Sequence, residues 1–250
     1  MLDHLWGWYE RTCNPIVADY DRGKRDEALC ALSELKSSIE AAGLDEDDCM
    51  AMSIMLDYLE YSLYESSGDK EEAQSCADKL IAELAAPLPL TYTEIVRRRC
   101  LLCLLLEADA TGQRNLPMDA VRDLLSGIPR SDRLGDLYCH LAAWAYKHRD
   151  MHHLELARED ILIHGGANQA SFYWRRIDLM HALLGGEAQP GQLLDLVKSA
   201  PSRHCLESLR ACLWDDCSTA GIVTPEVEQA YAAKLAALPQ RQYIKEPSQA

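Results

Sequence analysis

The chain has 250 residues, of which 48% are apolar, and it carries a net charge of −15. This acidity excludes nucleic acid and anionic membranes as expected partners, because both repel a negatively charged surface. The longest apolar block, residues 100–106, is too short to cross a bilayer, and the opening residues lack the basic n-region of a signal peptide, so we expect a cytoplasmic protein.

The first strong helix signal in the chain is the pair Asn14 and Pro15. Asn14 can cap a helix, and Pro15 fits its first position, where a missing N–H has no cost. The next segment places apolar residues at helical spacing from Ala28 to Ile39, and Gly43 follows as a C′ residue. We therefore expect two helices between residues 14 and 42.

A second pair of helices is predicted directly afterwards. Asp45 or Asp47 can cap a helix whose apolar stripe runs from Met52 to Leu63. Gly68 then permits a turn, and the following helix is expected to end near Ala85, before a proline-containing stretch.

Thr91 is the predicted cap of a long helix, and Glu94 stands where the partner of a capping box is expected. The stretch 100–106 is apolar on all sides, which predicts a central helix. Further helices are expected at about 117–126, 132–148, 150–164, 168–184, 190–199, 202–219 and 224–238.

The fold class that follows is all-α. Strand signals are nearly absent, and short breaks between helices indicate antiparallel neighbours. We predict about 11–13 helices in one domain over residues 1–238, followed by a disordered polar tail at 239–250. The ten cysteines lie mostly inside helical patterns beside Leu and Ala, so we interpret them as reduced packing residues.

One spacing recurs along the chain. Tyr64 precedes Gly68 by four residues, and Ala73 follows it by five, which places an aromatic residue before a turn and a small residue after it. A similar pattern surrounds Gly23, with Ala28 five residues after it and Tyr20 one position nearer, three residues before it. Altered versions are centred on Gly112, Asp150 and the pair Gly185 and Gly186.

This pattern resembles the hairpins of tetratricopeptide-like repeats, over roughly residues 14–220. The resemblance implies a right-handed, solenoid-like array of antiparallel helical hairpins. It also implies an extended surface that binds a partner protein or peptide, as in an adaptor or a chaperone.

Catalytic motifs are missing from the sequence. It has no phosphate-binding glycine loop, no dinucleotide fingerprint and no nucleophile elbow, so we expect no enzyme activity and no cofactor. The histidines at 140, 148, 152 and 153 are the sharpest candidate metal cluster, whereas Cys100 and Cys103 have the spacing of half a zinc site without a second pair. A turn at Arg149 and Asp150 would separate the histidines, and we predict no metal site, with a helical metalloprotein as a remaining alternative.

The acidic residues are concentrated in the first half of the chain, which has a net charge of −13 over residues 1–125. This charge predicts a basic partner, and it leaves open an inhibitor or immunity protein that occludes a basic toxin or a nucleic-acid-binding enzyme. The candidate contact residues are Tyr58, Tyr61, Tyr64, Asp45, Asp47 and Asp48. The alternative for the tyrosines is a packing role at the edge of the core. Nothing in the pattern specifies an oligomeric state.

Overall fold

The computed structural model describes residues 3–41, 44–133 and 135–238. Within these ranges it holds twelve α-helices, one short 3-10 helix and no strand, which confirms the all-α prediction. The predicted cap Gly43 and the predicted tail 239–250 lie outside the described residues. The helices are α1 Asp3–Asp21, α2 Arg25–Ala41, α3 Glu46–Ser67, α4 Lys70–Glu83, α5 Thr91–Ala110, α6 Met118–Ser126, the 3-10 helix Arg130–Asp132, α7 Gly135–Lys147, α8 Met151–Ile163, α9 Phe172–Gly185, α10 Pro190–Ser199, α11 Arg203–Thr219 and α12 Pro225–Ala237.

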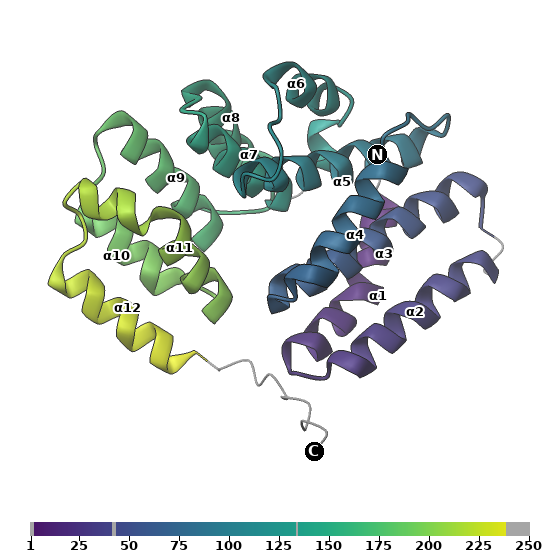
Figure 1. The fold of residues 1–250 in the computed structure, drawn as a ribbon, viewed down its shortest axis with the longest axis horizontal. Helices are drawn as coiled ribbons and strands as arrows, with labels where there is room; N and C mark the ends of the chain where they lie inside the picture. The colour runs from purple at the N-terminus through teal and green to yellow at the C-terminus, as the bar shows by residue number, and fades with distance from the viewer. Residues whose placement is uncertain (1–2, 42–43, 134, 239–250) are drawn as a thin grey trace. The chain divides into compact units, whose positions relative to one another are not determined.

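The contacts divide the chain into two compact units (Figure 1). The first unit contains α1–α4, most of α5, and α6; the second contains the end of α5 and α7–α12. None of the described helices is both long and apolar enough to span a membrane.

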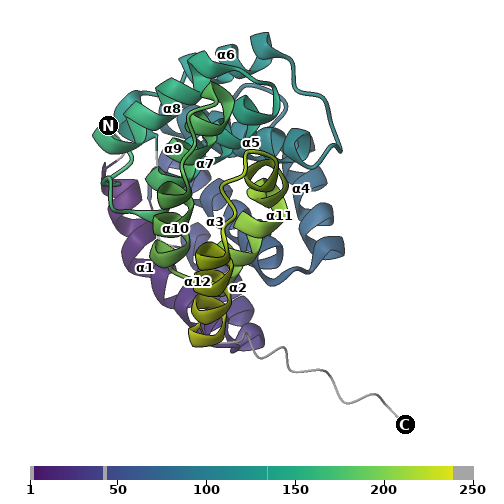
Figure 2. The same ribbon diagram turned by 90° about the vertical axis from the view of Figure 1, so that its left-hand side faces the viewer.

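In the first unit, α1 packs against both α2 and α3, α2 packs against α3, and α3 packs against α4 (Figures 1 and 2). The predicted stripe of α3 is buried, with Met52, Leu56, Leu59 and Leu63 each at most 5% exposed. Hydrophobic burial on one face is what holds a helix of this kind in place.

The second unit repeats this packing pattern. Helix α7 packs against both α8 and α9, α8 packs against α9, and α9 packs against α10 (Figure 1). Its core includes Trp144, Tyr138 and Leu137, whose exposed fractions do not exceed 1%.

The hairpins are closed by one kind of turn. After the helix, a residue with positive φ donates its backbone N–H to the carbonyl oxygen three residues earlier. The backbone N–H of the next residue is donated to the carbonyl oxygen five residues before that residue. This is the Schellman arrangement, which satisfies carbonyl groups at a helix end. It occurs at Gly23, Gly68, Gly112, Arg149, Gly186 and Gly221.

The turns at Gly23 and Gly68 lie next to each other in the first unit. The hydroxyl of Tyr20 donates to Oγ of Ser67 at 3.0 Å, and Arg25 pairs with Asp69 at 2.6 Å. Both contacts join the first hairpin to the second at the same end, which means that the two hairpins stack with their turns aligned.

The predicted helix start at Asn14 and Pro15 is wrong. Helix α1 begins at Asp3, and Pro15 lies in its interior. An interior proline removes one backbone hydrogen bond and costs about 3 kcal/mol. Apolar residues are buried on both sides of it, including Leu5 and Trp6 before it and Ile16 after it, and this burial outweighs the loss.

The predicted capping box of α5 is also wrong. Glu94 does not bond back to Thr91; its Oε2 accepts a hydrogen bond from the backbone N–H of Leu88 at 2.9 Å. The first N–H groups of α5 are satisfied instead by Asp47 of α3, which is distant in sequence.

Candidate functional site

The three tyrosines predicted to contact a partner lie on α3, and two of them are interior residues. Tyr58 and Tyr61 are each 7% exposed, and their ring centroids are 5.8 Å apart. The guanidinium of Arg99 lies 5.8 Å from the Tyr58 ring. Tyr58 and Tyr61 therefore pack inside the first unit.

Tyr64 is half-buried, and the guanidinium of Arg25 lies 5.6 Å from the centre of its ring. Burial, followed by the negative charge of Glu60, raises the pKa of Tyr64 above its usual value. Of the three tyrosines, Tyr64 thus has the largest surface that a partner could reach.

The predicted acidic residues all make contacts within the first unit. Asp45 caps α3 by accepting a hydrogen bond from the N–H of Asp48 at 3.0 Å. Asp48 itself lies 2.9 Å from Nε2 of His4. A contact of these residues with a partner stays a prediction, and it would compete with these internal bonds.

Asp47 connects α3 to the start of α5. Its carboxylate accepts hydrogen bonds from the N–H groups of Tyr92 at 2.9 Å and of Thr93 at 2.7 Å. Burial alone would raise its pKa, but these bonds outweigh burial and lower the pKa of Asp47 below its ordinary value. Asp47 thus ties α3 to the start of α5.

Two of the four histidines in the predicted cluster, His148 and His153, each pair with a different aspartate. Nε2 of His148 lies 2.8 Å from Oδ1 of Asp109, and Nδ1 of His153 lies 2.7 Å from Oδ2 of Asp150. The predicted turn at Arg149 separates His148 from the histidines of α8. Over the described residues, no three His, Cys, Asp or Glu side chains come together as a metal site would require.

Asp109 is the centre of one of these pairs and is fully buried. It accepts a hydrogen bond from the N–H of Leu116 at 2.6 Å and lies 3.0 Å from Nζ of Lys147. Burial opposes its charge, but the bonds from Leu116, His148 and Lys147 lower the pKa of Asp109. The end of α5 is therefore held against the end of α7 by a buried carboxylate.

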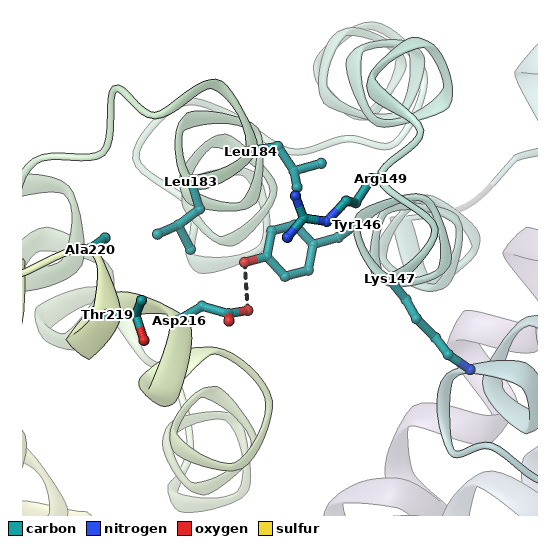
Figure 3. A pocket seen from close by; sticks show the side chains of 8 residues that line it. All are labelled: Tyr146, Lys147, Arg149, Leu183, Leu184, Asp216, Thr219 and Ala220. Atoms are coloured by element: carbon teal, nitrogen blue, oxygen red, sulfur yellow. Dashed lines mark hydrogen bonds between the residues drawn. The ribbon is translucent and has the colours of Figure 1, made fainter.

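A pocket of about 370 Å³ lies beside this cluster in the second unit (Figure 3). It is formed where α7, α9 and α11 end, so three helix C-termini surround it. The lining residues are Tyr146, Lys147, Arg149, Leu183, Leu184, Asp216, Thr219 and Ala220.

One hydrogen bond spans the pocket. The hydroxyl of Tyr146 donates to Oδ2 of Asp216 at 2.7 Å, which connects α7 to α11 (Figure 3). Burial and this bond to a carboxylate raise the pKa of Tyr146 well above its ordinary value, so the phenol stays protonated. The pair supplies a carboxylate oxygen to a ligand, while the adjacent leucine side chains supply apolar surface.

Arg149 and Lys147 are the two cationic residues that line the pocket. Arg149 is exposed, and its φ is 54°, which makes it the one described residue other than glycine with a positive φ. The sequence predicts a turn at Arg149, but its pattern does not mark Arg149 as a site residue. The signal that could have identified it is the arginine itself, since the corresponding turns at Gly23, Gly68 and Gly112 carry glycine.

Comparison of the chain with known protein families, curated proteins and solved structures gave no match. The resemblance to tetratricopeptide-like repeats therefore stays a prediction from the hairpin pattern.

Proposed function

We propose that this protein is a non-catalytic binding module built of tetratricopeptide-like hairpins, and that it acts as an adaptor or chaperone for another protein. The observation that carries the proposal is the repeated Schellman turn, which occurs six times in the described chain. An array of such units exposes an extended surface, and the usual use of this surface is to hold a partner.

The small residues after the turns support the same proposal. Ala28 and Ala73 are 2% and 7% exposed, and each stands five residues after a turn glycine. A small side chain at this position lets the second helix of a hairpin approach the first closely. The first helix of one hairpin packs on the first helix of the next in two places, α1 on α3 and α7 on α9, as a stacked array of hairpins requires.

A second candidate is an acidic inhibitor or immunity-type protein. The observation in its favour is the net charge of −13 over residues 1–125. Such a surface attracts a basic toxin or nucleic-acid-binding enzyme over long range, and salt weakens the attraction.

Capture of proteins from host lysate on the immobilised full chain, at low and at high salt, separates these functions. An adaptor or chaperone should retain partners at both salt concentrations, in near-stoichiometric amounts by mass spectrometry. A single basic partner released by salt would favour the inhibitor. Heat-denatured protein on the same resin is the control for capture by exposed core residues, and retention no greater than this control would contradict both functions.

A further inference from the structure

We propose that the pocket at the ends of α7, α9 and α11 binds a short segment of a partner protein, with a carboxylate of that segment held by Arg149 and an adjacent aliphatic side chain against Leu183 and Leu184. This inference rests on the proposed function and assigns a site and a ligand chemistry to it.

The residue type at position 149 is unusual for its turn. The six Schellman turns of the described chain place glycine at the positive-φ position five times and arginine once. A residue with a Cβ is unfavourable in this backbone conformation, whereas glycine adopts it at no steric cost. Glycine would therefore satisfy the turn better than Arg149 does, so the turn itself gives no reason for an arginine at this position.

Arg149 also differs from its neighbours in that no described carboxylate pairs with it. Lys147 donates to the carbonyl and carboxylate of Asp109, His148 pairs with the same carboxylate, and Asp150 pairs with His153. No described carboxylate forms an ion pair with Arg149, whose side chain reaches the rim of the pocket (Figure 3). An exposed guanidinium presents a planar fork of donors that matches a carboxylate.

The rest of the pocket selects for a peptide over a small anion. Three helix C-termini and Asp216 place negative charge around the pocket, so a multiply charged phosphate would be repelled there more strongly than a single carboxylate. A peptide segment with a single carboxylate also carries backbone N–H groups beside it. Asp216 and Thr219 can accept hydrogen bonds from those groups, and the volume of about 370 Å³ lies within the range of ligand pockets.

The test begins with selection of displayed random peptides on the immobilised full chain, followed by binding of the enriched synthetic peptides by fluorescence anisotropy. We expect enrichment of peptides with an acidic residue, or a terminal carboxylate, next to Leu, Ile or Val. Arg149→Gly should weaken their binding about tenfold or more, because a hydrogen-bonded charge pair is lost. Arg149→Lys should retain part of the binding, and the amide analogue of the acidic peptide should lose it as Arg149→Gly does.

The melting temperature of the Arg149→Gly variant also tests whether the substitution disturbs the fold. Glycine suits the turn, so the melting temperature of this variant should equal or exceed that of the natural protein. A lower melting temperature would show a structural role for the arginine side chain and would overturn the inference. Equal peptide affinity in the variant, enrichment of peptides without a carboxylate, or no enrichment at all would overturn it too.

The outcomes distinguish this pocket from the broader proposal. If the Arg149→Gly variant no longer binds the selected peptides, the pocket assignment and the proposed binding function are both supported. If the variant captures the same lysate proteins as the natural chain and binds the selected peptides equally well, the pocket assignment fails and the proposed binding function remains. If neither protein captures anything beyond the denatured control, the proposed function itself fails.

Discussion

Replacement of Glu94 by glutamine should destabilise the first unit strongly and in a pH-dependent way. The carboxylate of Glu94 lies 2.6 Å from Nε of Arg97 and 2.7 Å from Nε of Arg98, and it accepts from the N–H of Leu88. The side chain of Arg97 is only 4% exposed. Removal of the negative charge would leave a buried guanidinium without its counter-charge.

The magnitude follows from the pKa of Glu94. Burial raises this pKa, but the bonds from Arg97, Leu88 and Arg98 prevail and lower it from 4.5 to about 2. A difference of about 2.5 between the unfolded and folded pKa corresponds to roughly 3 kcal/mol of stability. Glutamine can still accept one of the hydrogen bonds, so we expect Glu94→Gln to lower the free energy of unfolding by about 2–3 kcal/mol near neutral pH.

The sign of the pH dependence is fixed by the lowered pKa. The contribution of Glu94 is fully present above its unfolded pKa of 4.5, and it is lost as the pH falls towards about 2. Urea unfolding of both proteins, followed by circular dichroism at about pH 7 and about pH 3, should therefore show a difference that shrinks by more than half at the lower pH.

The matched control is Glu83→Gln. Glu83 lies 3.9 Å from Lys79, and both side chains are more than half exposed, at 52% and 72%. An exposed pair of this kind contributes little, and the change should stay below about 0.5 kcal/mol. Equal losses in the two variants, or a Glu94→Gln effect that does not change with pH, would refute the reasoning.

Asp47→Ala should lower the stability of the first unit by about 1–2 kcal/mol in urea unfolding, because Tyr92 and Thr93 lose the acceptor for their N–H groups. An unchanged free energy of unfolding would show that water caps α5 equally well. Gly68→Val should cost roughly 1–3 kcal/mol, since its φ is 80°, and an unchanged melting temperature would contradict the need for glycine in this turn. Tyr58→Ala should cost about 3–5 kcal/mol in the same assay because Tyr58 is only 7% exposed. A Tyr58→Ala variant that keeps its stability and loses partner binding would instead place the ring on the contact surface.

The turns and the helices that follow them could be predicted from the sequence because their signals are local. Gly23, Gly68 and Gly112 occupy the positive-φ positions of their turns, and the predicted bounds 190–199 are those of α10. In each case a few neighbouring residues determine the local backbone conformation. The prediction failed at α1, where burial along the whole helix outweighed the local stop signal of Pro15.

The candidate site could be predicted only in part, because its contacts join distant positions. Aspartate is usually a surface residue, and only the fold brings Asp47 to Tyr92 and Thr93. Likewise, Tyr146 and Asp216 are 70 residues apart, and no periodicity in the sequence pairs them. The helical spacing predicts Tyr58 on a flank of its helix, at the edge of the apolar stripe. In the structure this flank is covered as well, and Tyr58 is buried.

The aligned hairpins have a consequence for how the chain folds. Helices that follow each other along the chain, such as α1 and α2, α3 and α4, and α7 and α8, are also packing partners. Folding rates rise when contacts join residues that are close in sequence, because little loop entropy is lost before a contact forms. Each hairpin can therefore form early around its own turn, while carboxylates such as Asp47 and Asp109, which bridge distant helices, form their bonds late. Substitutions at these two aspartates should accordingly speed unfolding more than they slow folding.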